Sequence, residues 1–182
     1  MSRLVIAVAV VLAGPVAWAE DAASRRADQA YTSHISEGHE LFTNGSHDAA
    51  LRAYREALTE RRDDAAATYF IACAQRALGQ NDEALASFRR AAQLAGSDDE
   101  ALHARALMNV ALVQELRRDL VAAAEAWQVY IAYAETHQRV PTYVANARQR
   151  LEAIQRVQEL DTTYDAVRQR IAEDRSDEPV NR

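Results

Sequence analysis

The sequence predicts an all-α protein whose core is a stack of helical hairpins. Small and apolar residues recur every three or four positions over most of the chain, which is the spacing of one helical face. Runs of residues typical of strands are absent, and glycine and proline are scarce, with 5 and 3 of 182 residues. In addition, the same pattern of small and large residues recurs 34 positions later in the chain, which indicates a structural repeat.

The clearest copy of this repeated pattern lies at residues 65–98. A first apolar face ends at Gly79 and a second begins at Ala84, so two helices are joined by a tight glycine turn. The small side chains of Ala72 and Ala84 allow the two backbones to approach closely, and Phe88 fills the gap beside them. This segment therefore predicts a helix–turn–helix hairpin.

The hairpin resembles a tetratricopeptide repeat, in which defined positions hold a small residue, a turn glycine, an alanine, an aromatic residue and another alanine. In residues 65–98 these are Ala72, Gly79, Ala84, Phe88 and Ala91. In residues 31–64 they are Gly38, Gly45, Ala50, Tyr54 and Ala57. In residues 104–137 they are Ala111, Arg118, Ala123, Trp127 and Tyr130. The resemblance implies a right-handed superhelix of three repeats at residues 31–137, in which the leading helix of each hairpin lines a concave groove.

The outer copies depart from the pattern. Arg118 replaces the turn glycine, Tyr130 is larger than the usual alanine, and five residues, 99–103, precede the third copy. If these residues are helical, they lengthen the next helix by about 7 Å, at about 1.5 Å per residue. Ser97 or Asp98 is placed to cap that helix.

Residues 1–19 are predicted to be a cleavable signal peptide. The apolar run at residues 4–13 is followed by small residues at Ala17 and Ala19, which suit cleavage between Ala19 and Glu20. We expect a bacterial periplasmic or secreted product without stable membrane insertion. The alternative, an uncleaved anchor, is disfavoured because a bilayer span needs about 20 apolar residues.

The segments that flank the repeats are also expected to be largely helical. Residues 20–30 read as a tail and helix extension, with Ser24 as a candidate cap, and residues 138–173 as one long helix with Pro141 in its first turn. Residues 174–182 read as a disordered tail. An apolar stripe runs along one face of the long helix and consists of Val144, Ala147, Leu151, Ile154, Val157, Leu160, Tyr164, Val167 and Ile171.

That stripe is longer than three repeats can cover. Either the helix breaks at residues 161–163 and folds back, or its distal half binds a partner, with Tyr164, Val167 and Ile171 as candidates for self-association into a homodimer. Two successive steps of three residues near Val157 interrupt a regular heptad, which disfavours a long coiled coil.

Residues that could support catalysis are poorly arranged. The five histidines lack the i, i+4 spacing of a helical metal pair, and no phosphate-binding glycine loop is present. Cys73 is the only cysteine, which excludes an intrachain disulfide, and it reads as a small apolar residue. The formal charge is −6, and without a basic cluster nucleic acid is a poor ligand. We therefore expect no enzyme activity, cofactor or metal.

Groove positions in the resembling family recur in steps of three and four on each leading helix. The candidate groove residues are Ile35, His39, Phe42, Tyr69, Cys73, Arg76, Met108, Leu112, Glu115 and Leu116. Repeats that clamp the carboxylate of a chaperone tail carry Lys and Asn where this chain has Ile35 and His39, so that ligand is disfavoured. A peptide or amphipathic partner helix fits better, unless the protein's own terminal helix covers the surface.

These features predict a protein–protein interaction scaffold or assembly factor in the bacterial cell envelope, with Tyr69, Met108 and Leu112 as anchors on one shared surface. One alternative is a self-assembling structural protein that dimerises through its C-terminal helix. Another is a non-catalytic subunit of an envelope enzyme.

Overall fold

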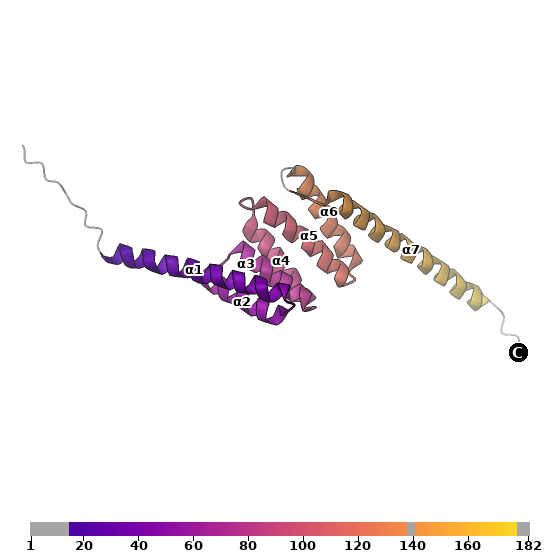
Figure 1. Ribbon diagram of the computed structural model, residues 1–182. Coiled ribbons are helices and arrows are strands. Elements are labelled where there is room, and N and C mark those ends of the chain that lie inside the picture. The colour runs from indigo at the N-terminus through magenta and orange to yellow at the C-terminus, as the bar shows by residue number, and fades with distance from the viewer. Residues whose placement is uncertain (1–14, 138–140, 178–182) are drawn as a thin grey trace, which may run out of the picture.

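The computed structural model describes residues 15–137 and 141–177, and within these ranges every regular element is a helix (Figure 1). The all-α fold class is thus confirmed. The helices are α1 (Pro15–Thr43), α2 (His47–Glu60), α3 (Ala65–Ala77), α4 (Asn81–Ala95), α5 (Glu100–Leu116), α6 (Leu120–Thr136) and α7 (Val144–Asp177).

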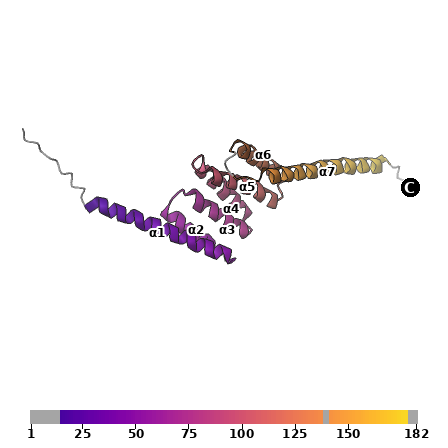
Figure 2. The same ribbon diagram turned by 45° about the horizontal axis from the view of Figure 1, so that its top comes forward.

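Six of these helices form three stacked hairpins. Helices α1 and α2, α3 and α4, and α5 and α6 pack pairwise, and each hairpin packs on the next through α2 and α3 or α4 and α5. Helix α7 continues the series by packing against α6. The hairpins lie side by side in both views, with α1 and α7 projecting at opposite ends (Figures 1 and 2).

The repeated small and aromatic positions form the core. Ala72, Ala84 and Phe88 are fully buried in one cluster together with Val110 and Val113 of the next hairpin. The equivalent aromatic residues of the outer repeats, Tyr54 and Trp127, are each only 2 % exposed. Each hairpin therefore closes around one aromatic side chain, as the resemblance implied.

The turns of the three hairpins are alike although one lacks glycine. In each, the turn residue donates its backbone N–H to the carbonyl three residues earlier, at Gly45, Gly79 and Arg118. Their φ angles are +78°, +74° and +59°, in the left-handed region. A side chain there is strained by roughly 1 kcal/mol, so Arg118 adopts the family's turn at an energetic cost.

Another departure has a structural reason. Tyr130, at a position usually held by alanine, is 2 % exposed, and its hydroxyl accepts a hydrogen bond from the backbone N–H of Tyr143 at 3.0 Å. The larger side chain thus ties the last residue before α7 to the third hairpin.

The residues inserted before the third repeat lengthen α5, which has 17 residues where α3 has 13. Its cap is Asp99, whose carboxylate accepts the N–H of Leu102 at 2.9 Å, so the expectation of Ser97 or Asp98 was wrong by one or two residues. The inserted segment contributes the cap itself as well as the first helical turn.

Helix α1 begins at Pro15 and not at Ser24. Residues 20–26, expected to belong to an N-terminal tail, are helical, and they contain no glycine or proline that would stop the helix. The helix also crosses the proposed cleavage site. Residues 1–14 lie outside the described part of the chain.

Helix α7 has 34 residues and is continuous through Asp161. A break at residues 161–163 is therefore wrong: the hydroxyls of Thr162 and Thr163 each donate to the carbonyl four residues earlier at 2.9 Å and remain within the helix. The helix begins at Val144, so Pro141 precedes its first turn.

The predicted tail from residue 174 is helical as far as Asp177, and residues 178–182 lie outside the described ranges. Across the described helices, none combines the length and hydrophobicity that a bilayer crossing requires.

Candidate binding groove

The leading helices α1, α3 and α5 carry all ten candidate groove residues. Of these, His39 and Leu116 are exposed and the other eight are half-buried. A half-buried side chain can contact the core on one side and solvent on the other. The contacts on each helix show whether a candidate residue mainly packs in the core or mainly faces solvent.

On α1 the candidates mainly serve the core. Ile35 and Phe42 pack against the buried cluster around Tyr54. The His39 ring lies edge-on to Phe70 of α3, with ring centroids 4.4 Å apart, and its Nδ1 is 2.9 Å from the Tyr54 hydroxyl. Burial raises the pKa of Tyr54 to about 12, so this phenol stays protonated. These side chains join the first hairpin to the second.

On α3, Tyr69 is also largely a packing residue. Its ring contacts the buried Phe88 with centroids 5.5 Å apart, and its hydroxyl accepts a hydrogen bond from Asn109 Nδ2 at 3.2 Å. Burial raises the pKa of Tyr69 to about 12 and also raises the pKa of the Cys73 thiol. A thiol held protonated is a poor nucleophile, in agreement with the interpretation of Cys73 as a small apolar residue.

The open part of this face lies where α3 and α5 end. A pocket of about 260 Å³, which we call the groove pocket, is lined by Arg76, Leu112, Glu115, Leu116 and Arg150. Four of these residues were expected from the sequence. Leu116 is 56 % exposed, so it forms an apolar surface available to a ligand.

Charge in the groove pocket is arranged around Glu115. One carboxylate oxygen accepts the indole N–H of Trp127 at 2.6 Å, and the other accepts from the Arg150 guanidinium at 3.2 Å. Within the described ranges Arg76 makes no ion pair. The pocket thus combines an apolar surface with a guanidinium that is available to an anionic group.

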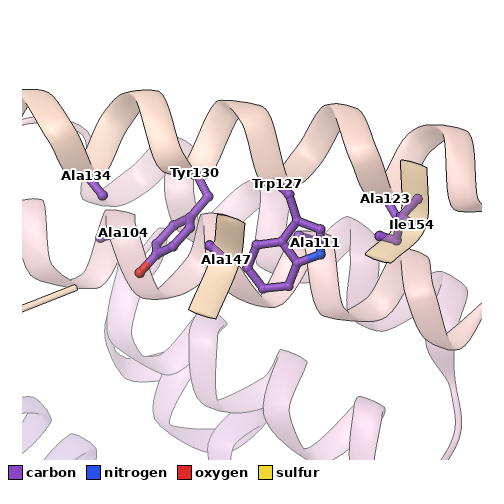
Figure 3. Close-up of a cluster of buried hydrophobic side chains, with 8 residues drawn as sticks. All are labelled: Ala104, Ala111, Ala123, Trp127, Tyr130, Ala134, Ala147 and Ile154. Atoms are coloured by element: carbon purple, nitrogen blue, oxygen red, sulfur yellow. The ribbon is translucent and has the colours of Figure 1, made fainter. Parts of the chain in front are cut away.

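Trp127 and Tyr130 form the support beneath this pocket. Both side chains point from α6 toward the alanines of α5 and α7 (Figure 3). Met108 and Leu112 pack against the same buried cluster. Leu112 therefore connects the groove pocket to the core of the third repeat.

Sequence reasoning missed Arg150, which lies on α7, because the groove was drawn from the three repeats alone. A signal was present: Arg150 lies between Ala147 and Leu151, residues of the apolar stripe that packs on α6. Treating α7 as the leading helix of a fourth unit would have placed Arg150 beside α5.

A second concave site was also missed. A pocket of about 430 Å³ lies between α4, α5 and α6. Its apolar lining includes Leu107, Val110, Ala126 and Val129. Ala92 and Ala122 also line it, and periodicity within one helix cannot reveal a space that three helices enclose.

The protein's own C-terminal helix borders the groove without filling it. Ala147 and Ile154 of α7 pack against α6, and Arg150 reaches Glu115 of α5. Toward its C-terminal end, α7 projects away from the stack (Figure 1). Helix α7 therefore contributes one wall of the groove pocket, through Arg150.

Several solved structures have the same fold. The Yersinia enterocolitica type III secretion translocator chaperone SycD superposes with a TM-score of 0.60 at 17% identity, over 72% of this chain and 85% of that chain. PcrH in complex with the chaperone-binding region of PopD gives 0.63 at 19% identity, over 72% and 95%. The TPR2B domain of yeast Sti1 in a pHsp70 complex gives 0.56 at 20% identity, over 69% and 93%.

A comparison with curated proteins gives no match. A sequence profile of the tetratricopeptide repeat matches twice, at residues 35–99 and 71–135, and the two matches together span more than half of the chain. Both matches cover the hairpins whose small, glycine and aromatic positions form the turns and the core described above. The chain therefore belongs to the tetratricopeptide repeat family.

Proposed function

We propose that this protein is a non-catalytic scaffold or assembly factor that binds a peptide segment of a partner protein in the groove pocket. The observation that carries the proposal is the pairing of exposed Leu116 with the Arg76 guanidinium beside it. An apolar side chain would pack on Leu112 and Leu116, and a carboxylate next to it would pair with Arg76. Such a charge contributes more to specificity than to affinity.

The structural relatives support a peptide ligand. PcrH is solved with the chaperone-binding region of PopD, and the Sti1 domain in a pHsp70 complex. Both have this fold at 20% identity or less. Their complexes support the class of ligand, while the residues of this chain select its chemistry.

The proposal predicts the sequences of peptides selected from a random library on the immobilised protein. They should carry a large apolar residue close to Asp or Glu. Replacing Arg76→Gln and Leu116→Ser together should weaken their binding by about 2 kcal/mol, roughly thirtyfold, as measured by fluorescence anisotropy. Peptides that bind the double variant as tightly as the wild type would contradict the proposal.

Two controls separate binding from folding. Val121→Ser alters a residue of α6 that is 63 % exposed and lies outside the groove pocket, so it should leave peptide affinity unchanged. The melting temperature of the double variant should stay close to that of the wild type because Leu116 is itself 56 % exposed. Tyr69 is unsuitable for this test because its ring supports Phe88.

We also propose that the protein acts in the cell envelope, on the strength of the signal-like residues 1–19. The mature chain should then begin at Glu20. Terminal sequencing of the protein from the envelope fraction of its native cells tests this expectation. Recovery from the cytoplasm with an N-terminus at Met1 would place its partner there instead.

A further inference from the structure

The distal half of α7 exposes an apolar face that no described element covers. We call its residues the distal stripe; they are Val157, Leu160, Tyr164, Val167 and Ile171. Each is between 40 and 62 % exposed. Isolated helices of this kind are marginally stable in water, and packing of an amphipathic face supplies most helix stability in proteins.

The spacing of the distal stripe is that of a coiled coil. From Val157 to Ile171 its members follow in steps of three, four, three and four residues, which are alternating a and d positions of a heptad. The irregular step that interrupts the heptad lies between Ile154 and Val157. Ile154 is the last residue of α7 buried against α6, so the heptad begins where the helix leaves the repeats.

The charged side chains that flank the distal stripe indicate what binds to it, namely a second copy of this chain. In this heptad Asp161 and Arg168 hold the two e positions. When two such helices run antiparallel, a residues face d residues and e residues face e residues. In the register that places Tyr164 opposite Val167, Asp161 of each copy faces Arg168 of the other, so two opposite-charge pairs form. Arg168 also pairs with Asp165 of its own helix, at 2.6 Å, and an exposed guanidinium can serve both carboxylates.

The same register matches side-chain sizes. The large Tyr164 meets the smaller Val167 in two central layers, and Leu160 meets Ile171 in the two layers next to them. Val157 lies at each end of the joined region, opposite the exposed Asp174. In a parallel pair, a residues would face each other. Two Tyr164 rings would then compete for one layer, and Arg168 would face Thr163, which carries no charge. Size and charge therefore both favour the antiparallel arrangement.

We propose that the protein forms an antiparallel homodimer through the distal stripe of α7. The two repeat stacks lie at opposite ends of the joined helices, and each keeps its groove pocket free. The dimer thus presents two separate groove pockets. This inference is independent of what the groove pocket binds.

The first test is the mass of the full chain by sedimentation equilibrium. The average mass should rise with concentration toward twice that of the single chain, and Val167→Glu should keep it monomeric because a charge cannot be hydrated in the interface. Asp161→Arg and Arg168→Glu should each raise the dissociation constant about tenfold. Mixing these two variants should restore association, because the arginine introduced in one chain then faces the glutamate introduced in the other.

Two controls accompany this experiment. Glu159→Arg makes the same change of charge as Asp161→Arg but at an exposed position away from the interface, and it should leave the dissociation constant unchanged. The variant with Arg76→Gln and Leu116→Ser should dimerise normally, which separates this inference from the proposed groove. A wild-type chain that is monomeric at every concentration would overturn the proposal.

Cross-linking tests the orientation in a Cys73→Ala background. Leu160→Cys and Ile171→Cys should form a disulfide only when the two variant chains are mixed. In the antiparallel register, Leu160 of the two copies is offset by about 16 Å along the axis, far beyond the roughly 7 Å limit between the Cα atoms of a disulfide. Efficient cross-linking of either variant with itself would indicate a parallel pair and overturn the inference.

Discussion

Replacing Trp127 with alanine is expected to lower the free energy of unfolding by about 3–5 kcal/mol, through lost burial and a residual cavity. The indole is 2 % exposed, packs edge-on against Tyr130 with centroids 5.9 Å apart, and donates its N–H to Glu115 at 2.6 Å. Removing it also deprives Glu115 of a donor. A loss of this size is a large share of the stability of a small domain.

Urea unfolding followed by far-ultraviolet circular dichroism measures this change without relying on tryptophan emission. Val129→Ala on the same helix is a matched control, because Val129 is 54 % exposed and its truncation should change stability by about 0.5 kcal/mol or less. A comparably small loss for Trp127→Ala would show that the third repeat is not closed around this ring.

Replacing Gly38 with leucine is expected to cost about 3 kcal/mol, at the upper end for overpacking a core. A Cβ atom at Gly38 would lie 2.3 Å from Cε1 and 2.5 Å from Cδ1 of Tyr54. The Tyr54 ring is 2 % exposed and cannot move into solvent without opening the first hairpin. The clash outweighs the roughly 1 kcal/mol that replacing a helical glycine by a better helix former gains.

A double-mutant cycle identifies the clash as the cause. With Tyr54→Leu in place, Gly38→Leu should cost far less than it does alone, because the ring that it meets has been removed. Ser36→Ala, at an exposed position of the same helix, should be nearly neutral in both backgrounds. Additive effects of Gly38→Leu and Tyr54→Leu would contradict the close approach of α1 and α2.

The repeat core could be predicted from the sequence because the residues that form it lie close together in sequence, within single hairpins. Ala72, Ala84 and Phe88 are placed by helical spacing within one hairpin, and the hydrophobic effect buries them wherever the hairpin forms. Arg118 could be assigned to the turn by its place in the repeat, although its residue type opposed the assignment. The turn geometry is imposed by the packing of the helices on either side.

The groove was harder to predict because exposure depends on the neighbouring helices. Leu116 and Arg76 were proposed from the groove positions of the resembling family, and both line the groove pocket. Tyr69 satisfied the same spacing but packs on Phe88 of α4 and bonds to Asn109 of α5. Arg150 depends on how α7 docks against the third hairpin, which no periodicity within the repeats encodes.

The continuity of α7 could not be decided from local propensity. Asp161 and the two threonines after it are weak helix formers, and the apolar stripe on either side fits both a straight helix and a folded one. The hydroxyls of these threonines donate hydrogen bonds to backbone carbonyls of the same helix. They therefore do not stabilise a turn that would compete with the helix.

The projecting helices give a single chain unusual hydrodynamics. A compact protein of 182 residues has a radius of gyration of about 16 Å, whereas α7 with its 34 residues is itself about 51 Å long. With α1 projecting at the other end of the stack (Figure 2), even a monomer should elute from gel filtration ahead of globular standards of equal mass. Small-angle scattering from it should show a pair-distance distribution with a long tail, produced by the two projecting helices that define the span of the molecule.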